Sequence, residues 1–396
     1  MKKILTLLLL CLLLAGCASA NPTPTPTPAP TPSPTPEPTP EPTPEPVVIG
    51  GKSFVVTDEA VDLRDCAVTA DELHAGLAAL PALQEADLRG CALTNEEKLA
   101  LREAFPEVAF GWAVDVLGVM ADSADEYICL DNIPLQDTAE LEALLPLLPN
   151  VTKIDMCGCG IADEAMYELN QRHEDVRFIW IAPMGSARLR TDITYFSQNN
   201  VGMLCNLNDD RLDNNLRYFP DLIALDLGHG RGSIHRCDWL KHVPKLQYLI
   251  LAECMITDIT PVGELSELRY LELFLNLGLT DISPLAKLQK LEAVNLSETP
   301  ISDFSPLKEC KALRYCWANI VWNLPDVAHL AEIAAALPDC FINHSPYGCT
   351  SGIWRELDIY FEMRDAFHAH YMGGDRGDSY RVMPDGSIEL VKKSNS

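Results

Sequence analysis

The sequence lacks a long apolar run, an excess of basic residues and the common catalytic motifs. Its longest apolar stretch, residues 4–15, has about a dozen residues, whereas a bilayer-spanning helix needs about 20. The chain has 30 Lys and Arg against 57 Asp and Glu, a formal net charge of −27, so we expect no nucleic-acid partner. The motifs G-x-S-x-G, H-E-x-x-H and the phosphate-binding loop are absent. We therefore expect no enzymatic activity, no cofactor and no metal site.

The N-terminus has the features of an export signal. Residues 1–3 (M-K-K) are a short positive region, and residues 4–15 are apolar. Residues 14–17 (L-A-G-C) resemble the bacterial lipobox, in which cleavage precedes the Cys and a lipid is attached to its thiol. The alternative is an ordinary signal peptide with a chance Cys, and both export the chain. We predict a lipoprotein signal peptide at residues 1–16, lipidation of Cys17 and anchoring to the outer face of the bacterial cell membrane.

The next segment, residues 17–46, is predicted to be a spacer. Between residues 21 and 46 the sequence is mostly Pro and Thr, with a few Ala, Ser and Glu. Proline fixes φ and removes an amide donor, so this segment favours an extended polyproline-like conformation. At about 3.1 Å per residue it reaches roughly 80 Å.

A repeat L-x-x-L-x-L recurs in the second half of the chain. Its successive first positions are Leu222, Leu246, Leu268, Leu291 and Leu313, with steps of 24, 22, 23 and 22 residues. These steps lie within the window of about 20–29 residues for leucine-rich repeats. Each copy predicts one short strand of a parallel sheet with its leucines pointing inward. Pro261, Pro284 and Pro306 recur in the second half of the repeats and exclude long helices there.

The phase, period and proline position together resemble the internalin-like repeats of Gram-positive surface proteins. The resemblance covers about residues 219–320 and rests on the segments I-T-D-I-T-P, L-T-D-I-S-P-L and I-S-D-F-S-P-L. It implies a leucine-rich-repeat fold and a role as an adhesion or interaction module. A particular partner does not follow from it.

The N-terminal half contains a looser duplication with an offset of 68 residues. Val108, Phe110 and Trp112 alternate as in a strand, and Val176, Phe178 and Trp180 repeat the pattern. Residues 95–104 and 163–172 are predicted helices. The two tryptophans are expected in equivalent core positions. These blocks look like degenerate leucine-rich repeats with helical convex sides; a separate α/β domain joined near residue 190 is the alternative.

The predicted fold is therefore an α/β leucine-rich-repeat solenoid with a Pro-Thr tether. A parallel sheet forms its concave face, and helical, 3₁₀ or extended segments form its convex side. Beyond the spacer we expect a repeat-like block at residues 47–190, an internalin-like domain at 191–328 and a C-terminal cap and tail at 329–396. Aromatic residues between 354 and 371 are the candidate cap of the last repeat. Residues 380–382 and 388–390 are expected to pair as a hairpin.

Several residues lie three positions beyond the last strand leucine or its equivalent, where a side chain can bond the backbone of a neighbouring turn. We interpret these residues as a structural ladder, and their cysteines as buried thiols rather than a metal site. They are Cys66, Cys91, Cys159, Cys254, Asn276 and Thr299. A disulfide between Cys340 and Cys349 is a separate possibility for the C-terminal cap.

Strand alternation assigns a further set of side chains to the concave face, where we expect the aromatic ones to cluster exposed. Clustered aromatic and acidic side chains on a rigid sheet are typical of binding surfaces. The predicted partner-binding residues are Tyr248, Tyr270, Phe274, Tyr315, Trp317, Asp226, Glu253, Glu272 and Glu298. In the alternative, the tyrosines only shield strand backbone, or the C-terminal segment folds over them.

The sequence thus predicts a lipid-anchored surface protein that recognises a protein or glycan through its concave face. The alternative is an envelope-associated or solute-binding lipoprotein with a ligand cleft. A deep polar pocket would favour the alternative, and an open, capped horseshoe would favour the first prediction.

Overall fold

In this computed structural model, the described residues are 45–198, 205–230, 232–319, 326–346, 348–368 and 379–391. Residues 46–396 form one compact unit. The predicted signal peptide, Cys17 and nearly all of the spacer lie outside the described residues. Within the described part, no helix is both long and apolar enough to cross a membrane.

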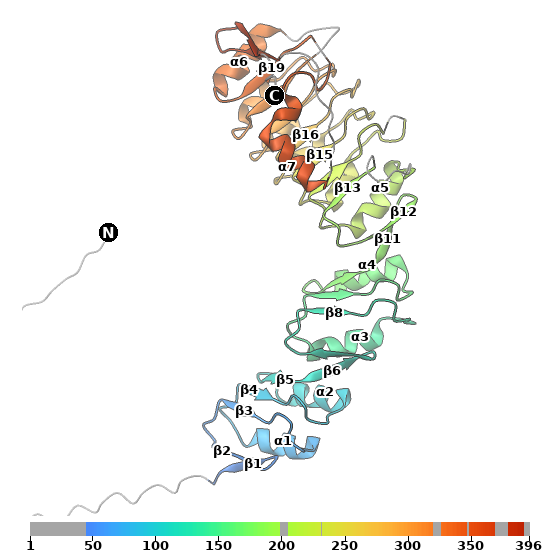
Figure 1. Cartoon of the computed structure of the whole chain (residues 1–396), viewed down its shortest axis with the longest axis vertical. Coiled ribbons are helices and arrows are strands. Elements are labelled where there is room, and N and C mark those ends of the chain that lie inside the picture. Colours follow the sequence, from blue (N-terminus) through green and yellow to red (C-terminus); the bar gives the residue numbers. More distant parts are fainter. Residues whose placement is uncertain are drawn as a thin grey trace, which may run out of the picture. The chain divides into compact units, whose positions relative to one another are not determined.

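The first block is a three-stranded parallel sheet, β3-β4-β5, flanked by two antiparallel hairpins, β1-β2 and β6-β7 (Figure 1). Helix α2 begins after Thr94, as predicted: the Thr94 hydroxyl accepts from the Glu97 amide at 3.2 Å, and the Glu97 carboxylate accepts from the Thr94 amide at 2.8 Å. This reciprocal cap satisfies two amides at the helix start. The elements are β1 (Val47–Ile49), β2 (Lys52–Phe54), β3 (Ala60–Asp62), α1 (Ala70–Ala78), β4 (Glu85–Asp87), α2 (Asn95–Ala104), β5 (Ala109–Gly111), β6 (Ala113–Val116) and β7 (Val119–Asp122).

The second block repeats the first. Strand β9 lies 68 residues after β4, and the same offset relates α4 to α2, β10 to β5, β11 to β6 and β12 to β7. Trp112 and Trp180 are both buried, as expected. The elements are β8 (Tyr127–Cys129), α3 (Ala139–Leu144), η1 (Leu145–Leu147, a 3₁₀ turn), β9 (Lys153–Asp155), α4 (Asp163–Arg172), β10 (Arg177–Ile179), β11 (Ile181–Met184) and β12 (Ala187–Arg190).

The third block contains the clear repeats. Seven strands pair in parallel and in chain order, from β13 to β19. Each proline-containing segment forms a 3₁₀ turn, as the prolines predict. The elements are β13 (Tyr195–Ser197), α5 (Asp209–Asn215), η2 (Leu216–Tyr218), β14 (Ala224–Asp226), η3 (Asp238–His242), β15 (Tyr248–Ile250), η4 (Thr260–Glu264), β16 (Tyr270–Glu272), η5 (Ser283–Lys287), β17 (Ala293–Asn295), η6 (Ser305–Glu309), β18 (Tyr315–Trp317), α6 (Val327–Ala336) and β19 (Phe341–Asn343).

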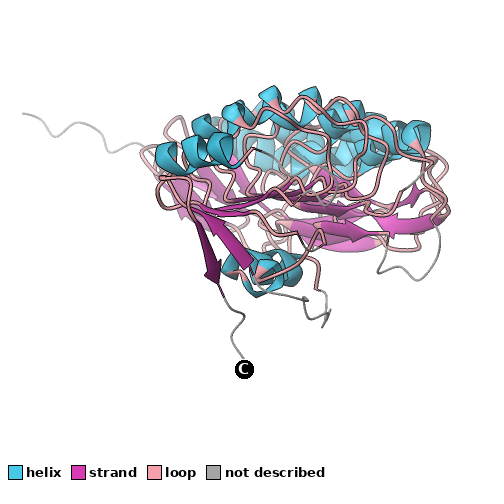
Figure 2. Ribbon diagram, turned by 90° about the horizontal axis from the view of Figure 1, so that it is seen from above, coloured by secondary structure: helices cyan, strands magenta, loops and turns pink. Residues whose placement is uncertain are grey.

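The C-terminal segment adds η7 (Trp354–Glu356), α7 (Asp358–Ala366) and a hairpin of β20 (Ser379–Val382) and β21 (Ile388–Val391). The hairpin was predicted, and it extends the sheet antiparallel to β19. Most helices lie on one side of the strands, and a helical segment lies on the opposite side (Figure 2). Helix α7 contacts β16.

One turn geometry recurs after the strands. Two residues beyond the last strand leucine or methionine, the chain has a positive φ, for example Asp65 at 57°, Glu253 at 54° and Leu275 at 60°. This left-handed conformation reverses the chain and directs the next residue toward the neighbouring turn. Although the parallel sheet is interrupted by the hairpins, one apolar core extends from Ile49 to Val382. The repeats, the parallel register and this shared core define a leucine-rich-repeat solenoid.

Candidate functional site

The concave face is built from two rows of side chains. Within each strand the central residue points into the core, and its neighbours point outward. Strand pairing aligns Asp226, Ile250 and Glu272 across three adjacent strands. Two positions further along the chain, the corresponding residues are Gly228, Ala252 and Phe274. Gly228 and Ala252 therefore leave space in the second row. This space lies beside the carboxyl groups of Asp226 and Glu272 in the first row.

The C-terminal segment packs onto this face. The Trp354 indole Nε1 donates to Glu272 Oε1 at 3.0 Å, and the Trp317 Nε1 donates to the Ser351 carbonyl at 2.9 Å. Two ion pairs hold α7: Arg314 Nη2 to Asp358 Oδ2 at 2.7 Å, and Arg269 Nη2 to Glu362 Oε2 at 2.8 Å. A second apolar cluster forms between the strands and this segment, separate from the solenoid core.

The prediction that the concave aromatic residues are exposed was wrong for most of them. Tyr270 and Trp317 are 0% exposed, and Tyr248, Phe274, Glu272 and Glu298 are below one tenth. Burial of these large rings beneath a second apolar segment removes more apolar surface from water than an open face would. Tyr315 and Glu253 stay half-buried. The prediction that residues 354–371 cap the last repeat was also wrong, because residues 354–367 cover the face of the sheet instead.

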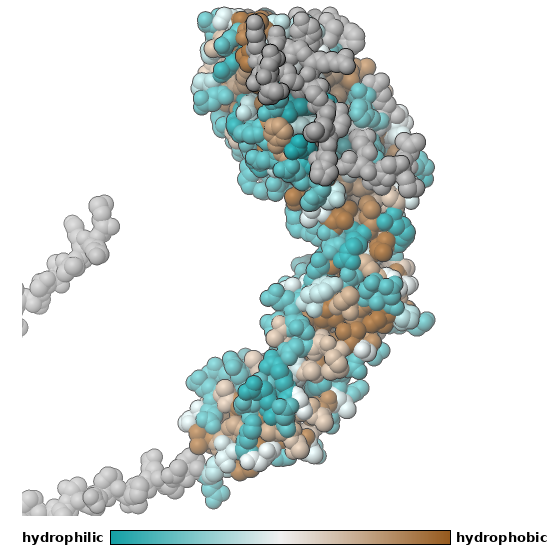
Figure 3. Space-filling model, in the orientation of Figure 1, coloured by the Kyte–Doolittle hydropathy of each residue, from teal (hydrophilic) through white to brown (hydrophobic). Residues whose placement is uncertain are grey.

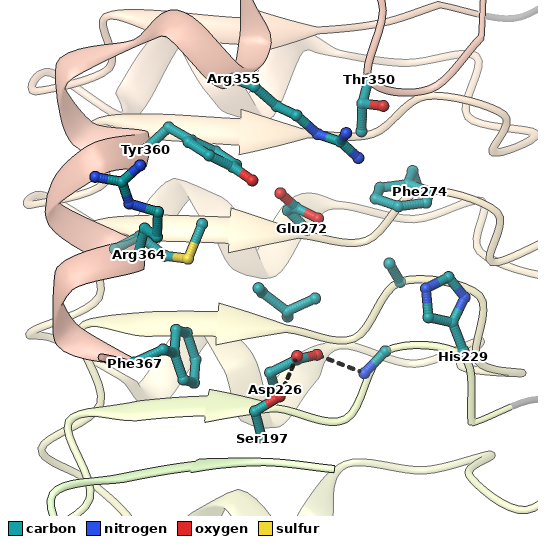
Figure 4. Close-up of a pocket in the computed structure, with 14 residues that line it drawn as sticks. Ser197, Asp226, His229, Glu272, Phe274, Thr350, Arg355, Tyr360, Arg364 and Phe367 are labelled. Carbon is teal, nitrogen blue, oxygen red and sulfur yellow. Dashed lines mark hydrogen bonds between the residues drawn. The ribbon is translucent and has the colours of Figure 1, made fainter. Parts of the chain in front are cut away.

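Between the strands and the C-terminal segment lies a cavity of about 280 Å³ (Figure 4). Its roof comes from Tyr360, Met363 and Arg364 of α7 and from Phe367 directly after the helix, a spacing that places side chains on one helical face. Of the nine predicted partner-binding residues, Asp226, Glu272 and Phe274 line it. The full lining is Ser197, Asp226, Gly228, His229, Ile250, Ala252, Glu272, Phe274, Thr350, Arg355, Tyr360, Met363, Arg364 and Phe367.

The two carboxyl groups of the cavity have different surroundings. Asp226 accepts from the Ser197 hydroxyl at 2.7 Å and from the Gly228 amide at 2.9 Å. Glu272 is buried, and this burial raises its pKa, although hydrogen bonds from Tyr270 and Trp354 and the charge of Arg355 act in the opposite direction. Burial also raises the pKa of the Tyr270 hydroxyl, which donates to Glu272. The cavity therefore combines charged, neutral polar and apolar groups.

No family model and no curated protein matches this chain. Its solved neighbours are leucine-rich-repeat proteins. Internalin C2 from Listeria monocytogenes is 19% identical with a TM-score of 0.22, over 67% of this chain and 84% of that one. Internalin F from the same species is 13% identical with a TM-score of 0.27, over 80% and 74%. A leucine-rich-repeat protein from Leptospira interrogans is 13% identical with a TM-score of 0.25, over 72% and 76%. These identities and TM-scores are too low to support the fold assignment, which rests on this chain's own repeats.

Four of the six ladder residues contact a backbone carbonyl of the preceding turn. Cys91 Sγ donates to the Leu63 carbonyl at 3.2 Å, and Cys159 Sγ donates to the Leu130 carbonyl at 3.2 Å. Cys254 Sγ lies 3.5 Å from the Leu227 carbonyl, and Asn276 Nδ2 lies 2.9 Å from the Leu251 carbonyl. The other two members differ: Thr299 bonds the Leu296 carbonyl of its own turn, and Cys66 is half-buried beside Gly50.

Among the described residues, no cysteine forms a disulfide, so the possible Cys340–Cys349 bridge is not present. In the same part of the chain, no group of three or more His, Cys, Asp or Glu side chains could hold a metal ion. The face in Figure 3 mixes hydrophilic and hydrophobic surface without one dominant apolar patch. The cavity under α7 is accordingly the candidate site.

Sequence reasoning missed the roof of this cavity. Tyr360 and Met363 of α7 and Phe367, which caps its C-terminal end, share one face and are buried. Their spacing of three and four residues is an amphipathic helix signal that the sequence contains. The signal does not show which surface the apolar side of α7 contacts, because that surface, around β16, lies about 90 residues earlier in the chain.

Proposed function

We propose that this chain is an exported recognition protein, lipid-anchored through Cys17 on the outer face of a bacterial membrane, that binds a small ligand in the cavity under α7. The cavity is the observation that carries the proposal. It is formed by the outward-facing side of the repeat sheet, the side that leucine-rich repeats leave available for binding. The Pro-Thr spacer would hold the folded unit away from the membrane.

The size of the cavity favours a small solute over a macromolecule. Ligand pockets commonly measure about 300–1,000 Å³, and this cavity of about 280 Å³ lies just below that range. Its lining is partly apolar and has a few polar groups that can orient a ligand. A protein or glycan would meet the C-terminal segment first, since that segment covers the aromatic residues.

The test uses the mature chain, residues 17–396, with Cys17→Ser so that it carries no lipid. Its thermal unfolding is measured with individual amino acids, sugars and nucleosides, because a ligand that binds only the folded state raises the melting temperature. The variant Ala252→Leu fills the cavity and should abolish the shift. Ala92→Leu, which adds the same atoms at an exposed position, should retain it. Equal shifts in both variants would contradict binding in the cavity.

Protein recognition is the second candidate, favoured by one observation. The concave face already binds a helical peptide, namely the chain's own α7, through two ion pairs and an apolar cluster. A partner with a similar helix could exchange with α7. Capture of a protein by the Asp358→Lys variant but not by the parent would support this second function.

A further inference from the structure

We propose that the outward face of strands β14–β18 is a docking surface for an acidic amphipathic helix of a partner protein, and that the chain's own α7 occupies this surface until the partner replaces it. This inference rests on protein recognition, the second function proposed for this face, and adds the kind of partner. We call residues 349–367, which carry α7 across the strands, the strap (Figure 4).

The strap is a loop that can leave the sheet without breaking it. Strand β19 ends at Asn343, which pairs with Arg381 of β20, and the His344 amide donates to the Tyr380 carbonyl at 2.8 Å. The two ends of the loop are therefore joined at its base. The apolar residues of the strap pack in the outward cluster, and no described residue of the strap belongs to the solenoid core. A segment attached in this way can open locally while the repeats stay folded.

Helix α7 does not fill the surface that it covers. A cavity of about 280 Å³ lies between it and the strands. Gly228 and Ala252 leave this space on the side of the sheet, and Met363 borders it on the side of the helix. A void forfeits the contacts that its lining atoms would otherwise make. A helix with a larger side chain in place of Met363 gains these contacts, so the surface accepts a better-fitting helix than the resident one.

Two arginines at the rim select an acidic helix. Arg269 and Arg314 directly precede β16 and β18, and Glu292 precedes the strand between them. The Glu292 carboxylate lies 2.6 Å from Arg269 Nε and 3.3 Å from Arg314 Nη1. Two guanidiniums thus share one carboxylate of the sheet. Asp358 and Glu362 of α7 supply the further negative charges, at 2.7 Å from Arg314 and 2.8 Å from Arg269.

These contacts define a sequence pattern for the partner. Asp358 and Glu362 are four positions apart and share one side of the helix. The buried residues Tyr360, Met363 and Phe367 follow the first acidic position by two, five and nine residues. Both carboxylates are about half-exposed, so their ion pairs mainly fix the direction of the helix. The apolar residues supply most of the affinity.

The first test is native-state hydrogen exchange of the mature Cys17→Ser chain, in which no residue of the docking surface is changed. The strap should open without the repeats, so the protection factors of the α7 amides should be at least roughly 100-fold lower than those of β15 and β16. Equal protection in the helix and the strands would show that α7 opens only when the repeats unfold, and would overturn the proposal.

The second test adds the helix as a separate molecule. Asp358→Lys combined with Glu362→Lys reverses both charges that hold α7 and gives an unlatched chain. A fluorescent peptide of residues 353–367 is titrated against this chain and against the parent, and its anisotropy is measured. The peptide should bind the unlatched chain at least roughly tenfold more tightly, because the tethered α7 competes in the parent.

Three altered peptides test the pattern on the unlatched chain. The peptide with Asp358→Lys and Glu362→Lys should bind roughly tenfold more weakly than the parent peptide, because both charges then face arginines. The peptide with Met363→Phe should bind roughly tenfold more tightly, because the larger ring fills the cavity. Phe361→Ala is the matched control, since Phe361 is 41% exposed, and should bind as the parent peptide does.

The outcomes separate the proposals. Absence of peptide binding to the folded unlatched chain, or equal binding of the charge-reversed peptide, excludes the acidic helix. Dimerisation of the unlatched chain without peptide, measured by sedimentation, would make a second copy of this chain the occupant and would also exclude the partner. If the Asp358→Lys chain captures a protein that the peptide does not displace, the helix fails and protein recognition remains. If no peptide binds while a solute does, and Ala252→Leu blocks that solute, the helix fails and the cavity function remains.

Discussion

The indole nitrogen of Trp354 donates to the carboxyl of Glu272 at 3.0 Å and joins two residues 82 positions apart. The Trp354 ring also lies 5.4 Å from Tyr270 and 5.0 Å from Trp317, between ring centroids. Side chains that looked like an exposed binding face thus form part of a second core. The C-terminal segment contributes to the stability of the folded unit because it covers them.

Replacing Trp354 tests that contribution. Trp354→Ala removes a fully buried ring and leaves Glu272 without one of its donors. We expect the free energy of unfolding to fall by about 3–5 kcal/mol, measured by chemical denaturation. Phe361→Ala on the same segment is the control, because its ring is 41% exposed, and should cost far less. A similar small loss in both variants would contradict the packing of this segment.

The sequence identified the repeats because leucine spacing directly encodes which side of each strand is buried. The strands begin and end near the predicted positions, and the prolines at 261, 284 and 306 place the 3₁₀ turns. The helices at residues 95–104 and 163–172 match their predicted bounds. Each of these features depends on contacts within a repeat or with the next one.

The coverage of the concave face could not be predicted in the same way. The alternation of side chains along the strand shows that Tyr270 points away from the solenoid core. It does not show whether water or a distant segment of the chain covers that side chain. Choosing between them requires knowing where α7 lies in space. The hairpins β6-β7 and β11-β12, which interrupt the sheet, were missed for a different reason. The first strand of each hairpin continues the alternation of apolar residues from the preceding parallel strand. The pattern therefore does not mark where the parallel sheet ends and the hairpin begins.

The enclosed carboxyl of Glu272 predicts a pH dependence. Burial raises the pKa of Glu272 in the folded state, so the folded state binds this proton more tightly than the unfolded state does. The resulting stabilisation is complete below the unfolded pKa of about 4.3 and is lost as the pH rises through the folded pKa. Glu272→Gln cannot ionise. We therefore expect its stability relative to the parent to increase with pH.

The measurement is the free energy of unfolding of parent and variant across a pH series from acid to neutral. Other ionisable groups near the site, Asp226, Arg355 and Tyr270 among them, are present in both proteins and largely cancel in the difference. Glu107→Gln, at an exposed carboxylate, should show a smaller change. A stability difference that stays constant with pH would exclude ionisation of Glu272.

The ladder makes a prediction about Asn276. This side chain is fully buried: its Nδ2 donates to the Leu251 carbonyl at 2.9 Å and the Leu273 carbonyl at 2.8 Å, and its Oδ1 accepts from the Ile256 amide at 3.0 Å. Asn276→Ala leaves these backbone groups unsatisfied and should cost roughly 3 kcal/mol. The corresponding position of the preceding repeat is a cysteine, so Asn276→Cys should cost less.

Chemical denaturation of the two variants gives the comparison. Asn214→Ala provides the control, since Asn214 makes an exposed hydrogen bond to the Asp210 carbonyl at 2.8 Å, and its loss should be small. If Asn276→Ala were as mild as that control, the ladder would have no part in stability.

The cysteines predict a pattern of chemical reactivity. Of the twelve in the described residues, only Cys129 is exposed, three are half-buried and eight are buried. Burial also raises the pKa of Cys157, Cys254 and Cys310 to about 12. Because the thiolate is the reactive form, brief treatment of the native Cys17→Ser protein with a maleimide should label Cys129 first. Cys129→Ser should abolish that rapid addition.

Denaturation without a reductant then tests the state of the remaining thiols. All twelve should be labelled in the unfolded chain, which intact mass measures directly. Ten additions with protection of Cys340 and Cys349 would indicate a disulfide formed in the exported protein, contrary to the two thiols seen in the structure. Rapid native labelling of Cys254 would instead show that the ladder opens. Such opening would expose the Leu227 carbonyl that this thiol contacts at 3.5 Å and separate adjacent turns of the solenoid.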